Sequence, residues 1–257
     1  MRKKLLFVFA GVLILNLALK LVALSISDKS IEHELILKAA QKILLITVVM
    51  FLFRWFNDQV RFRRPYNWMI DLAAITLTLV FFGVNLYSLR ANDSNHVLLI
   101  SATIGTGIFE ELFFRMFIFG VLFCCINTSS ESRITKAAIY TSLLFGLAHL
   151  SNLINPDASL FPIANQVILA FSIGILFQGI FLKSGSIVLV ICTHAIVNYL
   201  GTRHIILSAQ TTQISSEYSA LEVGLNLVLF SLFGAIITVI GLSMIRSAKG
   251  ANVIECN

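Results

Sequence analysis

Two adjacent glutamates interrupt an apolar stretch of the sequence, and their chemistry guides the interpretation of the whole chain. Glu110 and Glu111 lie within residues 104–120, and Arg115 follows about one helical turn later. The surrounding sequence is typical of a membrane span, where a buried charge costs from ~3 to more than 10 kcal/mol. Ionisable groups at such a depth usually serve a function, so this segment is a candidate active site.

The spacing of these three residues predicts different roles for the two glutamates. In a helix, Glu111 and Arg115 are four residues apart, in the order that favours an ion pair. Neighbouring helical residues point about 100° apart, so Glu110 is expected to have no such partner and to face a cavity. A carboxylate in this position suits a general base that activates water. Glu110 is therefore the predicted base, and Glu111 and Arg115 are its predicted support.

Two later apolar segments carry histidines at a similar spacing. His149 follows Phe145 by four residues and Asn198 follows His194 by four, so each pair shares one helix face. His194 and Asn198 together offer hydrogen-bond donors to an oxyanion, whereas His149 could do the same or hold a water molecule. Counting residues along each helix from the nearest basic loop gives the depth of Glu110, His149 and His194 in the membrane. The three depths differ by at most about 9 Å along the membrane normal. Phe145 is expected to be a packing residue.

The amino-acid composition indicates that the three polar segments belong to a membrane protein. Hydrophobic residues make up 58% of the 257 positions and charged residues 12%, whereas soluble domains carry about 25% charged residues. Long apolar blocks predict an all-α, polytopic membrane bundle of about eight transmembrane helices with a mid-membrane polar cavity. The expected spans are 5–26, 36–56, 68–89, 97–125, 135–151, 160–182, 185–202 and 221–245. Residues 1–257 are expected to form one integral membrane domain.

The basic residues of the loops predict that both termini are cytoplasmic. Lysine and arginine concentrate before the first span and after every second span, which is the pattern of cytoplasmic loops. The residues concerned are Arg2, Lys3, Lys4, Arg54, Arg61, Arg63, Arg64, Arg133, Lys136, Lys183, Arg246 and Lys249. The net charge of +6 therefore reflects topology, and nucleic acid is not an expected partner. The compact chain indicates a bacterial cell membrane.

Three further expectations concern the first span, three basic residues and the cysteines. Residues 5–26 are expected to be a retained helix, although their basic start also resembles a signal peptide. Lys20, Lys42 and Arg54 lie near the ends of predicted spans, so their side chains can extend to the membrane surface. The spacing of the four cysteines indicates neither a zinc site nor a disulfide framework.

Taken together, the three polar segments resemble the signature of the CAAX-processing and bacteriocin-processing (CPBP, or Abi) family of intramembrane proteases. That signature is Glu-Glu-x-x-x-Arg, then Phe-x-x-x-His, then His-x-x-x-Asn, and it lies here within a protease-like core at about residues 97–202. The resemblance implies a CAAX prenyl endopeptidase-like hydrolase in the lipid bilayer. Its implied substrate is a membrane-associated peptide or protein that is lipidated or hydrophobic.

The resemblance also implies a role for each residue of the site. Glu110 would activate the water, His149 would support that water or the base, and His194 with Asn198 would stabilise the oxyanion. No cofactor is expected, but zinc is the alternative, with Glu110, His149 and His194 as its ligands. Zinc hydrolases usually carry His-Glu-x-x-His on one helix, and this sequence lacks it, which favours a metal-free mechanism.

Two other functions stay open on sequence alone. The chain could be a non-catalytic scaffold that regulates another integral membrane protein, or a small transporter with a proton relay of glutamate and histidine. Taken singly, each histidine or asparagine is also explained as a hydrogen-bonding group between helices. The occurrence of all three motifs in order favours the protease.

Overall fold

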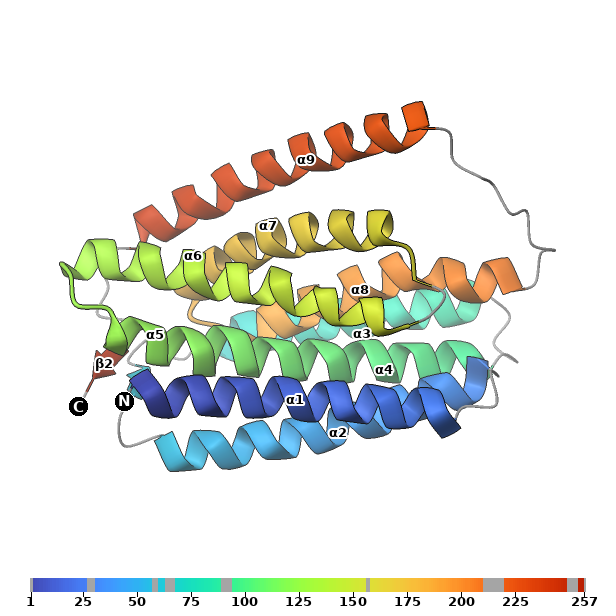
Figure 1. The fold of residues 1–257 in the computed structure, drawn as a ribbon, viewed down its shortest axis with the longest axis horizontal. Coiled ribbons are helices and arrows are strands. Elements are labelled where there is room, and N and C mark those ends of the chain that lie inside the picture. Colours follow the sequence, from blue (N-terminus) through green and yellow to red (C-terminus); the bar gives the residue numbers. More distant parts are fainter. Residues whose placement is uncertain are drawn as a thin grey trace.

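The structure of the chain is a bundle of long helices that run roughly along a common axis (Figure 1). It is a computed structural model and describes residues 2–26, 31–56, 60–62, 68–88, 94–155, 158–209, 220–248 and 254–256. The predicted all-α fold with about eight helical spans is confirmed. Of the loop cations that predict the orientation, Arg63, Arg64 and Lys249 lie outside the described residues.

Eight helical segments in the described part of the chain correspond to the eight predicted spans. The first three are α1 (Arg2–Ile26), α2 (Ile31–Phe56) and α3 (Trp68–Ser88). The fourth runs without a break through α4 (Ser94–Glu110), the π-helix η1 (Glu111–Ile118) and α5 (Phe119–Cys125). The fifth joins α6 (Ser130–Ala148) to the 3₁₀-helix η2 (His149–Ile154). The last three are α7 (Leu160–Ser184), α8 (Ile187–Ala209) and α9 (Ala220–Ser247).

Most of these helices are suited to a bilayer by length and composition. Six described segments are long and apolar enough to cross a membrane: Phe7–Ile26, Glu32–Arg54, Trp68–Asn85, Ser132–Ile154, Leu160–Ser184 and Leu227–Ser247. Ile187–Thr202 is a shorter apolar helix. The fourth span belongs to neither group. Its regular α-helix ends at Glu110, where the π-helix that contains Glu111 and Arg115 begins. The chain is therefore an integral membrane protein.

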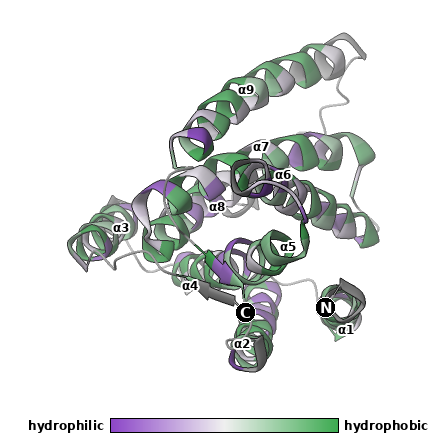
Figure 2. Ribbon diagram, turned by 90° about the vertical axis from the view of Figure 1, so that its left-hand side faces the viewer, coloured by the Kyte–Doolittle hydropathy of each residue, from purple (hydrophilic) through white to green (hydrophobic). Residues whose placement is uncertain are grey.

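The outer surface of the bundle is apolar. Figure 2 shows that hydrophobic residues predominate along most of the helices. Large side chains of α1, α3 and α9 point outward, among them Phe7, Leu77 and Val239, which are 78%, 68% and 67% exposed. Contiguous apolar surface of this kind is uncommon on a soluble monomer, but it is the expected surface toward lipid tails.

Small residues bring helix backbones close together, as they commonly do in membranes. A Cβ atom added at Gly241 of α9 would lie 2.7 Å from the backbone nitrogen of Leu176 in α7. One added at Gly179 of α7 would lie 2.8 Å from the carbonyl oxygen of Gly241. The packing of α9 along α7 therefore depends on glycine at both positions (Figure 1).

A small sheet and a disulfide join distant parts of the chain at one end of the bundle. Strand β1 (Val60–Phe62) pairs antiparallel with β2 (Ile254–Cys256). Cys124 and Cys256 form a disulfide with a Cα–Cα distance of 5.5 Å, which the spacing of the cysteines did not indicate. The two cysteines are 132 residues apart, and sequence spacing carries no information about such a contact. The start of α1 and β2 lie at this same end (Figure 1).

Candidate active site

The segment that carries the two glutamates departs from regular α-helical geometry. The α-helix ends at Glu110, and the π-helix η1 begins at Glu111. A π-turn adds a residue to the helical turn, is rare, and is frequently found at functional sites. The predicted ion pair is present, with Arg115 Nε 3.0 Å from Glu111 Oε2 and both side chains at most 1% exposed.

His194 of α8 lies between the two glutamates. Its Nδ1 is 2.5 Å from Glu111 Oε1, and its Nε2 is 3.5 Å from Glu110 Oε2. An ionised carboxylate only accepts hydrogen bonds, so Nδ1–H donates to Glu111 and fixes both the tautomer and the plane of the ring. The aspartate of a Ser-His-Asp triad acts on its histidine in the same way. Glu111 thus has two partners, of which the spacing of the sequence revealed only Arg115.

Glu110 has a cationic neighbour, so the expectation that it lacks one is wrong. Lys42 Nζ of α2 lies 3.8 Å from Glu110 Oε1, and the two side chains are 12% and 15% exposed. This distance and the 3.5 Å to His194 both exceed ordinary hydrogen-bond lengths. The carboxylate therefore has charge compensation nearby and keeps the capacity to accept a hydrogen bond from water or substrate.

Two lysines of the N-terminal helices point into the bundle rather than to the membrane surface. Lys42 lies eleven residues after the start of α2, which is about 16 Å along the helix. Lys20 of α1 donates hydrogen bonds to Ser151 Oγ and Asn152 Oδ1, both at 2.8 Å. Neither lysine extends outward, because polar partners on other helices hold both of them inside.

Phe145 packs at the centre of the site. The Arg115 guanidinium carbon lies 4.3 Å from the centroid of its ring, in cation–π contact. The ring also meets His149 and His194 at centroid distances of 5.0 Å and 5.9 Å. Phe177 of α7, which the sequence did not single out, also contacts Arg115, whose guanidinium carbon lies 5.7 Å from the centroid of its ring. Phe145 is therefore a packing residue, as predicted, and it packs against the buried guanidinium of Arg115 and the imidazoles of His149 and His194.

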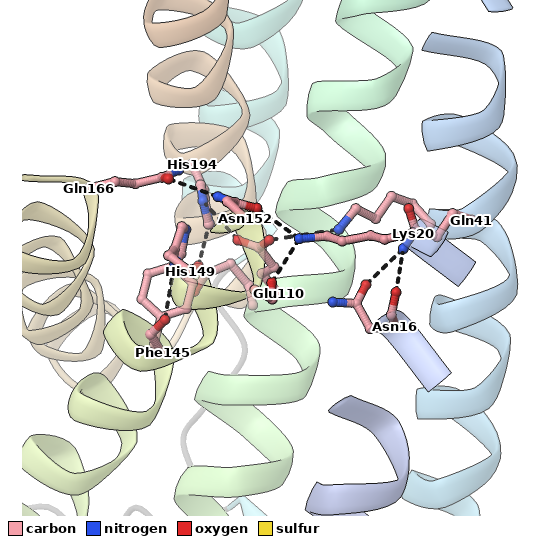
Figure 3. A network of polar contacts seen from close by, with 12 residues as sticks. Asn16, Lys20, Gln41, Glu110, Phe145, His149, Asn152, Gln166 and His194 are labelled. Carbon is pink, nitrogen blue, oxygen red and sulfur yellow. Dashed lines mark hydrogen bonds and ion pairs between the residues drawn. The ribbon is translucent and has the colours of Figure 1, made fainter. Parts of the chain in front are cut away.

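His149 lies where α6 gives way to the 3₁₀-helix η2. Its Nδ1 is 2.9 Å from the carbonyl oxygen of Phe145. A carbonyl oxygen only accepts, so Nδ1–H is the donor and Nε2 remains for another group. Figure 3 shows His149 and His194 beside the carboxylate of Glu110. The predicted convergence of the three motif segments is therefore present.

Asn198 is less closely joined to the other residues. It lies one turn beyond His194 on α8 and is half-buried. Its carbonyl oxygen accepts a hydrogen bond from Thr202 Oγ1 at 2.7 Å, but its amide makes no hydrogen bond to any described residue. The amide is therefore open to a ligand, and its oxyanion role stays a prediction.

Two contacts fix α8, and with it His194, against the glutamate helix. A Cβ atom added at Gly107 of α4 would lie 3.1 Å from the carbonyl oxygen of Ile191, so the two backbones approach closely there. Ser186 donates a short hydrogen bond to the buried Asp71 of α3 and accepts one from the backbone N–H of Leu189 at 2.8 Å. The first turn of α8 is thus tied to α3.

The zinc alternative needs a set of ligands that converge on one point. In the described part of the chain, no three side chains of His, Cys, Asp or Glu lie close enough together to hold a metal ion. The proposed ligands Glu110, His149 and His194 therefore do not fit a metal as they are arranged here.

One comparison with known proteins gives a match. Residues 92–200 match the family model described as type II CAAX prenyl endopeptidase Rce1-like. This segment contains all residues of the three motifs, from Glu110 to Asn198. Comparisons with curated proteins and with solved structures found no match. The proteins of the matched family are peptide hydrolases, and the motifs they are expected to use converge here inside a membrane bundle. Residues 92–200 are therefore similar to the Rce1-like family of type II CAAX prenyl endopeptidases.

Proposed function

We propose that the protein is an intramembrane endopeptidase in which Glu110 activates a water molecule. The substrate is a membrane-associated peptide or protein, lipidated or hydrophobic, cleaved near its C-terminus. The observation that carries this proposal is the position of His194, whose two ring nitrogens face the carboxylates of Glu110 and Glu111 at 3.5 Å and 2.5 Å. A histidine oriented by one carboxylate and facing a second is suited to acid–base chemistry.

Glu110 acts as the base in the first step. Its carboxylate takes a proton from a water molecule, and the resulting hydroxide attacks the carbonyl carbon of the scissile peptide bond. The distances of 3.8 Å to Lys42 and 3.5 Å to His194 are longer than ordinary hydrogen bonds, so the Glu110 carboxylate keeps lone pairs that can accept from this water. The product of this step is a tetrahedral intermediate whose oxygen carries the negative charge.

Asn198 donates a hydrogen bond to that oxyanion from its amide, and His194 donates from Nε2 in the form that carries a proton on both ring nitrogens. Glu111 and Arg115 hold the imidazole of His194 in place beforehand, so little reorganisation is needed when the charge forms. His149 directs Nε2 toward the water or the base. In the second step the C–N bond breaks, and Glu110 returns its proton to the leaving amine. The products are a new carboxylate and a new amine, and the enzyme is restored.

A metal-free reaction is part of this proposal. The sequence lacks His-Glu-x-x-His, and Glu111 already engages one ring nitrogen of His194. The chain's own carboxylates and donors supply both the proton transfers and the oxyanion stabilisation. The absence of a metal and the peptidase activity are separate claims, since either can hold without the other.

The test of the function is cleavage by the purified protein in detergent. Farnesylated peptides ending in the four CAAX residues are incubated with the protein in water enriched in ¹⁸O, and the products are identified by mass spectrometry. We expect release of the last three residues and one ¹⁸O atom in the new carboxylate after the lipidated cysteine. An intact peptide, with a folded and monodisperse protein, would favour the scaffold function instead.

A further inference from the structure

Beside the catalytic groups lies a cluster of polar side chains from helices outside the segment that matches the family. Lys20 and Asn16 belong to α1, and Lys42 and Gln41 belong to α2. Figure 3 shows the side chains of Lys20 and Asn152 next to Glu110. The family match covers residues 92–200, so it assigns nothing to these two helices.

Positive charge exceeds negative charge in this part of the bundle. Glu111 pairs with Arg115, and Glu110 has Lys42 at 3.8 Å. Lys20 is the remaining cation, and its hydrogen-bond acceptors are the neutral Ser151 Oγ and Asn152 Oδ1. Among the described residues, no carboxylate oxygen lies within ion-pair distance of Lys20. One ammonium group thus lacks a counter-charge inside a mostly apolar bundle.

Lys20 also lies close enough to Lys42 and Glu110 to interact with both electrostatically. Two ammonium groups that repel each other and share one carboxylate are an unfavourable arrangement in a medium of low dielectric constant. A second anion between them would remove the repulsion. The charge distribution therefore favours an anionic ligand at this position.

Hydrogen bonds hold Lys20 and its surroundings in place before any ligand binds. Asn152 donates from Nδ2 to Gln166 Oε1 at 2.8 Å, which fixes the amide that accepts from Lys20. Gln41 donates to Asn16 Oδ1 at 2.9 Å and to the Asn16 carbonyl at 3.1 Å, which joins α1 to α2. A prearranged ammonium group of this kind loses little conformational freedom when it binds an anion.

We propose that Lys20, supported by Lys42, binds the C-terminal carboxylate of the substrate and thereby selects for substrates cleaved close to their end. This inference rests on the proposed peptidase function, because a CAAX substrate carries a free carboxylate three residues beyond the scissile bond. Asn152, which accepts from Lys20, lies three residues after His149, about 6 Å along the axis of the 3₁₀-helix. Three extended residues span up to about 10 Å, so a carboxylate three residues beyond the scissile bond can reach that far from the catalytic groups.

Lys20 is the residue to test, because Lys42 lies beside the base and its removal would also alter Glu110. Lys20→Met keeps the unbranched stem and removes the charge, whereas Lys20→Arg keeps the charge. The matched control is Lys38→Met, since Lys38 of α2 is half-exposed and its ammonium group pairs with Glu34 at 2.5 Å. Each protein is assayed with two farnesylated peptides of one sequence, one ending in a free carboxylate and one in an amide.

We expect the kcat/KM of the wild-type protein to be at least about 30-fold higher for the acid than for the amide, mainly through a lower KM. The reason is that the ion pair between the Lys20 ammonium group and the substrate carboxylate is partly desolvated. Lys20→Met should lose this preference by slowing the acid alone, Lys20→Arg should keep most of it, and Lys38→Met should resemble wild type. Equal cleavage of acid and amide by the wild-type protein would overturn the inference while leaving the peptidase function intact. So would an unchanged preference in Lys20→Met.

A binding measurement separates this inference from catalysis. The tripeptide Val-Ile-Met, as free acid and as amide, is titrated into wild-type and Lys20→Met protein by calorimetry in detergent. Preferential binding of the acid to the wild-type protein, lost in Lys20→Met, supports the subsite even if no peptide is cleaved. Equal binding of the two tripeptides contradicts it even if cleavage is efficient. Failure of the subsite and failure of the peptidase function are therefore distinguishable.

Discussion

Glu111 and His194 are joined by a 2.5 Å contact between Oε1 and Nδ1, although they lie 83 residues apart in the sequence. The same carboxylate pairs through Oε2 with Arg115 at 3.0 Å. One fully buried group therefore both neutralises a buried guanidinium and orients the imidazole that faces Glu110. Changes at Glu111 should affect stability and catalysis together.

Glu111→Gln tests this double role. The substitution keeps the shape but removes the charge, which leaves Arg115 buried without its ion partner and His194 with a weaker acceptor. Loss of one partner from a buried pair destabilises by about 3–5 kcal/mol. We expect lower folded yield, a lower Tm in detergent and reduced kcat in the protein that folds. Glu34→Gln, at an exposed ion pair of α2, is the control and should leave all three unchanged. Normal Tm and full activity in Glu111→Gln would show that the buried pair has neither role.

Asn198→Ala tests the oxyanion role of the amide. Its side chain has no hydrogen bond to the described protein, so its removal should cost little stability. Loss of one oxyanion donor typically lowers kcat about 100-fold or more while KM changes little. Thr202→Val on the same helix removes only a hydroxyl bonded to a helix carbonyl and is the matched control. If the Asn198→Ala effect appears in KM alone, the residue binds substrate or packs and does not stabilise the transition state.

The reaction should proceed without a metal ion. We expect phenanthroline and EDTA to leave the cleavage rate unchanged within about twofold, and elemental analysis of active protein to find zinc well below one equivalent. If the activity instead depended on a zinc ion held by protein ligands, a chelator would remove that ion and the activity with it. Inhibition by phenanthroline that one equivalent of zinc reverses would assign Glu110, His149 and His194 as ligands.

The disulfide between Cys124 and Cys256 gives a prediction about both stability and orientation. Removal of a native disulfide typically costs about 2–5 kcal/mol. Cys256→Ser should therefore lower the Tm of the oxidised protein, and Cys192→Ser, at a free cysteine in the second turn of α8, should not. Reduction of the wild-type protein should lower its Tm to that of Cys256→Ser.

The same disulfide tests the orientation in the cell. The loop cations predict that the end holding β1 and β2 is cytoplasmic, where thiols are kept reduced. If that orientation holds, alkylation of intact cells before lysis should find Cys124 and Cys256 reduced, and the disulfide of the structure forms when the purified protein is oxidised. A disulfide already present in the cells would place this end in an oxidising compartment and reverse the predicted orientation.

The sequence predicted the helical spans and the convergence of the motifs because both depend on local information. A span needs only about twenty apolar residues, and four-residue spacing defines a helix face. The pairing of Glu111 with Arg115 belongs to this class. The contact of Glu111 with His194 does not, because it depends on how two separate helices pack.

The largest omission concerns Lys20 and Lys42. Both lie about one and a half turns inside a predicted span, and a long side chain at that position reaches the membrane surface as readily as the bundle interior. The direction is decided by partners on other helices, Glu110 for Lys42 and Asn152 for Lys20. The sequence did contain an indication that both helices have a polar side facing the bundle. Asn16 lies one turn before Lys20, and Gln41 is adjacent to Lys42. The π-helix at Glu111 is likewise a consequence of packing that no residue pattern indicated.

The role of Glu110 as the base is decided by the activity of purified Glu110→Gln protein on a farnesylated CAAX peptide. The substitution keeps the volume of the side chain but removes the group that accepts the proton from water. Tm and detergent-solution size are measured on the same preparations, with Glu34→Gln as the control for loss of a glutamate on an exposed helix face. We expect Glu110→Gln to retain the wild-type size and a measurable folded transition while cleavage falls by a factor of about 10⁴ or more. Cleavage by folded Glu110→Gln at a rate near that of wild type would contradict the assignment of Glu110 as the base.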